Sequence, residues 1–364
     1  MPSGNLGAHC FEARLDAAAQ PITPTRDFFV RSHFAVPQIR RNEWRLSVGG
    51  TVDRPFDLDY NDLQALPHRE LEVTVECAGN SRSSVRPKTE GVPWGHGAVS
   101  TARWRGVPLA IVLEQAGVSS RAREVVFRGA DHGREPGLAG ELHFEMSVGI
   151  EKALDPDTLL VDEMNGQPLA PAHGFPVRAL VPGYYGMASV KWLTDVHVID
   201  RPFQGYFRTQ EYVYIPGERH GQTSPIPATV IRVKSLVTWP LEGQVLGSGP
   251  HSIRGIAWSG ASPVVRVEVS VSPASAPGEN WRLARLDPPT SRYALAEWEL
   301  PFTFDEAGAY TIHVRATDES GNDQPSVAEW NLRGIGNNSI HSVSITVAPS
   351  RARASESLPN RPAA

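Results

Sequence analysis

Apolar and polar residues alternate along most of the chain, and only short stretches repeat with the period of a helix. Alternating or continuously apolar runs predict strands at 71–77, 124–127, 177–181 and 192–199. A helix is predicted at 108–116, because a proline opens its first turn and a glycine follows it, and a shorter helix is predicted at 61–66. The first part of the chain is therefore expected to be a mixed α+β domain.

The pattern changes after about residue 235, where turn residues alone separate the short apolar runs. Strands are predicted at 252–258, 264–271, 293–304, 310–316, 327–332 and 342–347. This spacing is typical of an immunoglobulin-like β-sandwich, although the cysteine pair of that fold is missing. The expected organisation is a first domain at 20–222, a sandwich domain at 223–349 and a disordered tail at 350–364.

Composition and charge narrow the class of protein. The 364 residues correspond to about two domains, and 40% hydrophobic with 21% charged residues is ordinary for a globular protein. The formal net charge of −5 creates no field that attracts polyanions, so nucleic acid is not expected as a partner. No apolar run approaches the ~18 residues of a membrane span, and no secretory or twin-arginine signal is found. A cytoplasmic protein is expected, unless a targeting segment has been removed.

The two cysteines, Cys10 and Cys77, are too few for a disulfide framework or a four-cysteine zinc site. Cys77 ends the strand predicted at 71–77 and points to its buried side. It is either a small buried hydrophobe or, because Arg82 and Arg86 follow closely, a thiolate stabilised by cations. A thiolate can act as a nucleophile or as a soft metal ligand.

These two uses of a thiolate make different demands on the chain. A nucleophile needs a base, and His96, His132 and His173 are available, although no local signature of a cysteine–histidine pair is present. A single thiolate ligand fits a metal whose other ligands come from an organic cofactor, which requires a site for a large anion. Residues suited to such a site are Arg31, His33, Asp131, His173, Arg178, Ser189, Lys191 and Arg333. Each of them alone is more often a surface charge or a turn residue.

Six motifs give a more specific indication. They are FFVRSH, VECAGNSRS, WGHGAVSTARWRGVPL, EMNGQPLAPAHGFPVR, YGMASVKWL and EWNLRG, and they lie between Asp27 and Val347. In sequence and in order they resemble the sulfite oxidase family of molybdenum enzymes, which includes the molybdenum domain of assimilatory nitrate reductases. The resemblance implies a mixed α/β molybdopterin-binding domain, then an immunoglobulin-like dimerisation domain, and hence a homodimer.

The resemblance also assigns roles to residues. It implies that the cofactor is molybdenum-molybdopterin and that the sulfur of Cys77 coordinates the metal. The positions that resemble the family's cofactor-holding residues are Phe29, Arg31, His33, Asp131, His173, Arg178, Ser189 and Lys191. The positions that resemble its substrate pocket are Arg31, Arg82, Trp94 and Arg333. Three arginines and an indole are suited to a small oxyanion.

Three positions depart from the family pattern. Asp162 occupies the place in LLVDEMNGQ where the vertebrate and plant sulfite oxidases carry a tyrosine, close to the molybdenum. Ser32 replaces the usual asparagine, and Ile340 replaces the usual tryptophan before His341. Beside three arginines, Asp162 is expected to be a catalytic-site residue that is ionised and paired with one of them. The alternative is a buried, protonated carboxyl that donates a hydrogen bond.

The resemblance implies an oxidoreductase that transfers an oxygen atom, with sulfite or a related sulfur oxyanion as the expected substrate. No haem domain is found in this chain, so an external electron acceptor such as a cytochrome is expected. Two alternatives stay open. On the same scaffold the reaction can run in reverse, as a reductase of nitrate or of an S- or N-oxide, and a carboxylate at 162 favours this. In a different class, the chain is a non-catalytic binding protein that uses its immunoglobulin-like domain.

Overall fold

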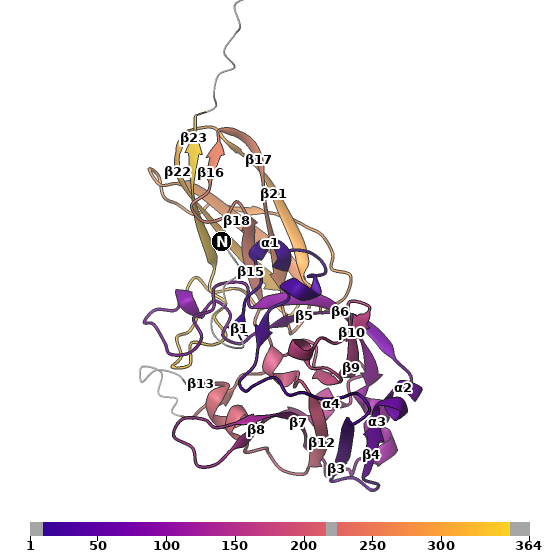
Figure 1. Ribbon diagram of the computed structural model, residues 1–364. Helices are drawn as coiled ribbons and strands as arrows, with labels where there is room; N and C mark the ends of the chain where they lie inside the picture. Colours follow the sequence, from indigo (N-terminus) through magenta and orange to yellow (C-terminus); the bar gives the residue numbers. More distant parts are fainter. Residues whose placement is uncertain (1–9, 216–223, 350–364) are drawn as a thin grey trace, which may run out of the picture.

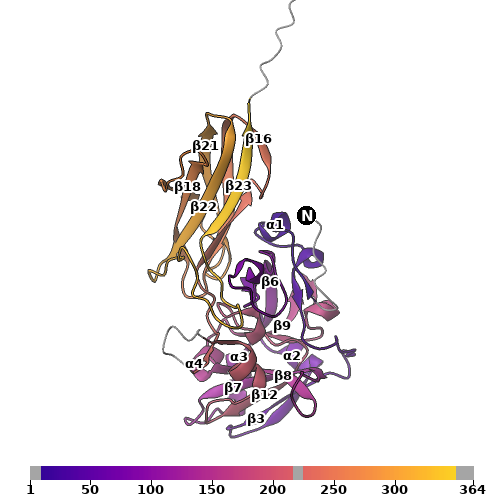
Figure 2. The same cartoon turned by 90° about the vertical axis from the view of Figure 1, so that its left-hand side faces the viewer.

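The computed structural model describes residues 10–215 and 224–349, which form two parts, one above the other in Figure 1. The N-terminal part combines two five-stranded sheets with short helices, and the C-terminal part is a β-sandwich. Loops at one end of the sandwich rest on the N-terminal part (Figure 2). No helix of the described residues is long and apolar enough to cross a membrane. The predicted tail and the predicted boundary at 222/223 lie outside the described residues.

One sheet of the N-terminal part ends beside Cys77. Its strands, all paired antiparallel, are β10 (Gln167–Pro168), β9 (Leu159–Met164), β6 (Val99–Pro108) and β5 (Arg69–Glu76) in spatial order, with β11 (Arg178–Leu180) also on β9. The last four residues of β5 are all buried, so this strand end is covered on both faces. Cys77 follows directly and is therefore held inside the protein.

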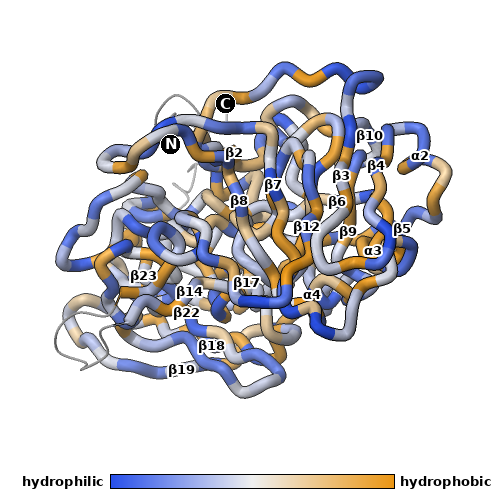
Figure 3. Tube along the Cα trace, turned by 90° about the horizontal axis from the view of Figure 1, so that it is seen from below, coloured by the Kyte–Doolittle hydropathy of each residue, from blue (hydrophilic) through white to orange (hydrophobic). Residues whose placement is uncertain are grey.

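The second sheet of the N-terminal part carries Asp131. In spatial order its strands are β4 (Phe56–Asp59), β3 (Arg45–Gly50), β12 (Leu193–Ile199), β7 (Glu124–Gly133) and β8 (Leu142–Gly149). Only the β3–β12 pair is parallel. Seen from below, β3, β12 and β7 lie side by side and carry apolar residues at their centre (Figure 3). The register of β7 on β8 shifts between Arg128 and His132, and Asp131 lies in this irregular stretch.

The helices are short, and the third of them packs against β3 and β6 of the two sheets. They are α1 (Leu15–Ala18), α2 (Tyr60–Ala65), α3 (Leu109–Ala116) and α4 (Ile150–Ala153). A capping box between Asp59 and Asp62 begins α2, and Gly117 ends α3 with a φ of 69°. Two small antiparallel sheets pair β1 (Cys10–Phe11) with β2 (Val30–Arg31) and β13 (Val213–Tyr214) with β14 (Ile226–Pro227).

The C-terminal part packs two sheets face to face. The first contains β15 (Lys234–Trp239), β17 (Gly249–Trp258), β21 (Ala296–Phe304) and β20 (Arg285–Leu286). The second contains β16 (Val245–Gly247), β23 (His341–Ala348), β22 (Gly308–Asp318), β18 (Val264–Pro273) and β19 (Trp281–Leu283). Alternate side chains, including Ile253, Trp298 and Ile312, fill a core between them. The chain is thus mixed in its first part and all-β in its second, as predicted.

Both predicted helices and most predicted strands are confirmed, but the strand predicted at 327–332 is wrong. The segment is irregular, and Val327 is 81% exposed. Trp330 donates its indole N–H to the Pro87 carbonyl at 3.0 Å, so the segment leaves the sandwich to contact the N-terminal part. Apolar alternation therefore misled the prediction where the chain crosses between the two parts.

Candidate active site

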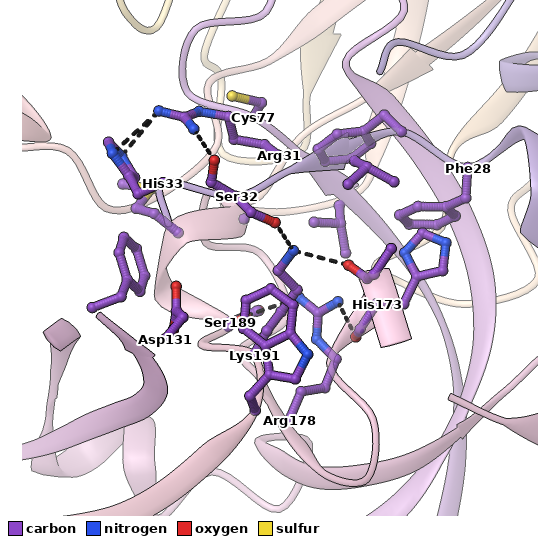
Figure 4. A pocket seen from close by; sticks show the side chains of 18 of the residues that line it. Phe28, Arg31, Ser32, His33, Cys77, Asp131, His173, Arg178, Ser189 and Lys191 are labelled. Atoms are coloured by element: carbon purple, nitrogen blue, oxygen red, sulfur yellow. Dashed lines mark hydrogen bonds between the residues drawn. The ribbon is translucent and has the colours of Figure 1, made fainter. Parts of the chain in front are cut away.

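A cavity in the N-terminal part encloses about 690 Å³ of space, part of it open to solvent. Its lining includes all the predicted cofactor-holding residues, namely Phe29, Arg31, His33, Cys77, Asp131, His173, Arg178, Ser189 and Lys191. In Figure 4, Cys77 and Arg31 lie at one end of the cavity and Arg178 lies at the other, with Lys191 and Asp131 between them. Segments far apart in the sequence therefore meet around one elongated space.

The thiol end is rigid. The Cys77 backbone N–H donates to the Ala98 carbonyl, and the Asn80 N–H donates to the Cys77 carbonyl, both at 2.9 Å. Burial raises the pKa of the Cys77 thiol, although Arg82 and Arg31 act in the opposite direction. The expectation that nearby cations favour the thiolate is thus corrected, because burial is the larger effect in the protein alone. A bound metal cation would supply the missing positive charge.

The opposite end carries two cations, Arg178 and Lys191, and the Asp131 carboxylate acts on Lys191 without forming a salt bridge. Arg178 is buried and donates to the carbonyls of His173 (3.1 Å) and Ser189 (2.8 Å). Lys191 donates to the Ser32 hydroxyl (2.6 Å) and the Ala172 carbonyl (2.9 Å). Burial lowers the pKa of Arg178 to about 10 and that of Lys191 to about 7. Neither forms a salt bridge within the described ranges, so this end is suited to an anionic group such as a phosphate.

Hydrogen-bonding groups lie between the two ends. Asp131 is buried, its Oδ1 has no hydrogen-bond partner in the structure, and burial raises its pKa to about 6. A Cβ at Gly129 would lie 2.4 Å from this oxygen, so glycine makes room for it. Burial lowers the pKa of His173 to about 4, so its ring is neutral at pH 7. A carboxylate with one free oxygen and a neutral imidazole can accept or donate hydrogen bonds at the edge of a heterocycle.

Arg31 connects the thiol end to a buried hydroxyl. It donates to the Ser32 carbonyl and to the ring of His33 (3.2 Å). The ring Nε2 of His33 lies 2.7 Å from the Tyr212 hydroxyl. Burial, followed by the charge of Arg31, lowers the pKa of His33 well below its usual value, and burial raises the pKa of Tyr212. A neutral hydroxyl therefore lines the same cavity as Cys77.

Arg82 and Arg333 meet beside the cavity but do not line it. Arg82 donates to the carbonyls of Arg333 (3.1 Å) and Val92 (2.9 Å). A Cβ at Gly79 would lie 2.9 Å from the Arg82 guanidinium, so this glycine leaves room for it. Arg333 is partly exposed and lies 3.2 Å from a carboxylate oxygen of Glu211. Arg82 and Arg333 thus differ, because Arg333 is already paired with an acid.

Trp94 is buried and belongs to the same apolar cluster as Cys77, which also contains Phe29 and Trp104. It does not line the cavity itself. The indole therefore supports the wall behind the thiol.

The structure does not place Asp162 beside these arginines, which corrects the expectation for this residue. Asp162 is buried on β9, where its Oδ2 accepts hydrogen bonds from Tyr60 (3.1 Å) and Gln64 (2.5 Å). A guanidinium nitrogen of Arg105 and the ring Nε2 of His68 each lie 3.7 Å from an Asp162 carboxylate oxygen. Since side chains alternate along a strand, position 162 faces α2 and not the cavity.

Tyr212 is the site residue that the sequence analysis missed. Its hydroxyl lines the same cavity as Cys77, whereas position 162, where the family's tyrosine was expected to lie near the metal, does not. It follows a five-residue π-helix, Phe207–Glu211, which directs it inward. No periodicity in the sequence singles out Tyr212 from the neighbouring Tyr206 and Tyr214, so only the fold identifies it.

Comparison with known proteins agrees with the division of the chain and with the site. Residues 33–207 match the family "Oxidoreductase molybdopterin binding domain", and residues 227–348 match "Mo-co oxidoreductase dimerisation domain". Sulfite oxidase of Gallus gallus is 38% identical over 334 residues, which cover 86% of this chain and 71% of the chicken protein. The mitochondrial sulfite oxidase of Homo sapiens is 36% identical over 349 residues, or 90% of this chain.

This chain spans 62% of the length of the human protein. Among solved structures, the sulfane dehydrogenase SoxCD from Paracoccus pantotrophus superposes with a TM-score of 0.80 at 27% identity. That likeness covers 94% of this chain and 85% of the other. The similarity therefore extends over both parts of the fold.

Proposed function

This chain belongs to the sulfite oxidase family of molybdopterin-dependent oxidoreductases, and on that premise we propose that it binds molybdenum-molybdopterin and oxidises sulfite or a related small sulfur oxyanion. The observation that carries the proposal is the cavity, with a thiol at one end and, at the other, two cations that form no salt bridge with a described residue. Such a donor set fits an elongated cofactor that has a metal at one end and a phosphate at the other.

In this proposal each wall of the cavity holds one portion of the cofactor. Cys77 is the metal ligand, Arg178 and Lys191 neutralise the phosphate, and Asp131 with His173 bonds the pterin edge. The remaining cofactor-holding positions are Phe29, Arg31, His33 and Ser189. When bound, the cofactor supplies oxygen-atom transfer coupled to the uptake of two electrons.

The protein's own contribution is to bind and orient the oxyanion. Arg31 and Arg82 supply positive charge near the thiol, and Arg333 supplies a third charge that Glu211 partly neutralises. The Tyr212 hydroxyl keeps its proton and can donate a hydrogen bond to a substrate oxygen. The burial of Tyr212 and the partial burial of Arg31 and Arg82 strengthen their hydrogen bonds to the oxyanion, relative to the same bonds in water.

We extend the proposal to the assembly and the redox partner. The molybdopterin-binding catalytic domain is assigned to 20–222 and the sandwich to 223–349, and two chains associate through the sandwich. An external acceptor such as a cytochrome removes the electrons. Sedimentation at micromolar concentration tests the dimer, and a monomeric full-length chain would contradict it.

Elemental analysis and one variant test the function. We expect about one molybdenum atom per chain and sulfite-dependent reduction of ferricyanide. Cys77→Ser should abolish this turnover but keep the pterin, because an alcohol is a poorer metal ligand than a thiolate while the phosphate contacts persist. If the protein contains molybdenum but turns over only nitrate or an S-oxide, the enzyme is a reductase and the reaction runs in the opposite direction. A chain that binds no molybdenum would favour a binding protein.

A further inference from the structure

Glu76, the residue before Cys77, contacts side chains of the C-terminal part. Its Oε1 accepts hydrogen bonds from Lys234 Nζ (3.2 Å) and Asn80 Nδ2 (2.9 Å), and its Oε2 accepts one from Trp258 Nε1 (2.9 Å). The side chains of Glu76 and Lys234 are each only 3% exposed. A pair buried this deeply keeps its geometry, because either charge alone is costly in the interior.

The loop that follows Cys77 is held from the same side. Lys234 also donates to the Ser81 hydroxyl (2.9 Å), and the Asn337 amide donates to the Ser81 carbonyl (3.0 Å). The Gly336 N–H donates to the Ala78 carbonyl at 2.7 Å. Ser81 has a φ of 67°, a left-handed conformation that non-glycine residues adopt when their surroundings hold them. Residues 76–81 are therefore fixed by contacts with the C-terminal part.

We propose that Glu76 and Lys234 are positioning residues for the sulfur of Cys77, so that the sandwich acts on the metal site as well as on association. This inference rests on the proposed function, in which Cys77 holds molybdenum. Residues behind a metal ligand fix its direction and tune the metal, although they touch neither metal nor substrate. Lys234 has no other salt bridge among the residues described, so its charge serves this carboxylate alone.

The test replaces both charges together with Glu76→Gln and Lys234→Met. Removing Lys234 alone would leave a buried carboxylate unpaired and could prevent folding. The double variant keeps the shape and one acceptor oxygen, which serves either Trp258 or Asn80. The control is Glu268→Gln with Arg315→Met, which removes a partly exposed 2.9 Å ion pair at the surface of the sandwich, away from the loop at 76–81.

Two measurements report on the sulfur without relying on turnover. The first is the electron paramagnetic resonance spectrum of pentavalent molybdenum in the loaded protein, whose g values depend on the direction of the sulfur ligand. The second is the rate at which iodoacetamide alkylates Cys77 in the cofactor-free full chain, with Cys10→Ser as background. We expect altered g values and faster alkylation in the double variant, and neither change in the control.

Kinetics supply a third measurement. We expect kcat for sulfite to fall roughly 10- to 100-fold with KM unchanged, because Arg31, Arg82 and Arg333 stay in place. Wild-type g values and a wild-type alkylation rate in the double variant would overturn the positioning role and leave the proposed function intact. If the wild type binds no molybdenum, the proposed function fails, and the alkylation rates still decide whether the ion pair fixes Cys77.

Discussion

Two lysines enclosed by protein show how the cavity differs from the contact between the two parts. Lys234 lies 3.2 Å from the Glu76 carboxylate, whereas Lys191 donates only to the Ser32 hydroxyl and the Ala172 carbonyl. Burial lowers the pKa of both, that of Lys191 to about 7. The same side chain thus forms a salt bridge in one region and none in the other, where the Asp131 carboxylate acts on it only from a greater distance.

The difference separates structural charges from charges that await a ligand. A buried ion pair is neutral as a unit and needs nothing further from solvent or ligand. A cation held by carbonyls and a hydroxyl, without a salt bridge, has a charge that an anionic ligand can still neutralise. Arg178 shares this condition with Lys191, and both line the cavity that contains Cys77. The absence of a salt bridge at Arg178 and Lys191 therefore supports the proposed assignment of this end of the cavity to the phosphate.

The largest effect is expected at the paired lysine. Lys234→Met should lower the free energy of unfolding by about 3–5 kcal/mol, because it leaves the Glu76 carboxylate buried and unpaired. Urea denaturation measures this, and adding Glu76→Gln should recover most of the loss. A single variant as stable as the wild type would show that Glu76 is not held as an ion in the folded protein.

The same contrast applies to the substrate cations. Arg82 forms no salt bridge in the described part of the chain, whereas Arg333 is paired with Glu211 at 3.2 Å. Arg82→Met should raise KM for sulfite roughly 10- to 150-fold. This corresponds to about 1.5–3 kcal/mol of lost binding, the range for a hydrogen bond to a charged group. Arg333→Met should raise KM less, because Glu211 already offsets that charge. An equal or reversed order in steady-state assays would mean that pairing does not decide the contribution.

A smaller effect of opposite sign is expected for the unpaired lysine. In the cofactor-free chain, Lys191→Met should stabilise the fold by about 2 kcal/mol at pH 7 or below, less than a fully buried ion because Lys191 is partly exposed. The same variant should retain less molybdopterin. Lys152→Met is the matched control, because Lys152 is paired with Asp155 at 2.9 Å and should gain nothing.

The pH dependence of this gain follows from the shifted pKa. Lys191 has a pKa of about 7 in the folded chain and about 10.4 when unfolded, so the unfolded state binds more protons between these values. Stability in the cofactor-free chain should therefore fall as pH drops from about 10 through 7. The Lys191→Met variant should lack this portion of the slope, and parallel unfolding curves for both proteins across pH would contradict the assignment.

The sequence predicted the two-part fold and the polar residues of the cavity, because motifs carry residue identity and alternation marks strands. It could not predict which charges are paired, since Glu76 and Lys234 are brought together only by the contact between the two parts. Position 162 shows the same limit. Motif order placed Asp162 near the metal, but strand alternation turns it toward α2, and the hydroxyl comes from Tyr212 instead.

The smallest effect is expected at Asp162, a buried carboxylate that has structural partners. Asp162→Asn should lower the free energy of unfolding by about 1 kcal/mol, because the amide oxygen still accepts from Tyr60 while the attraction of Arg105 at 3.7 Å is lost. Neither kcat nor KM for sulfite should change, since Asp162 faces α2 and its hydrogen-bond partners are Tyr60 and Gln64. Urea denaturation and steady-state kinetics measure the two expectations separately. A change in kcat or KM that corresponds to more free energy than the loss of stability would contradict this expectation. It would show that Asp162 belongs to the active site and that a buried charge with structural partners can still take part in the reaction.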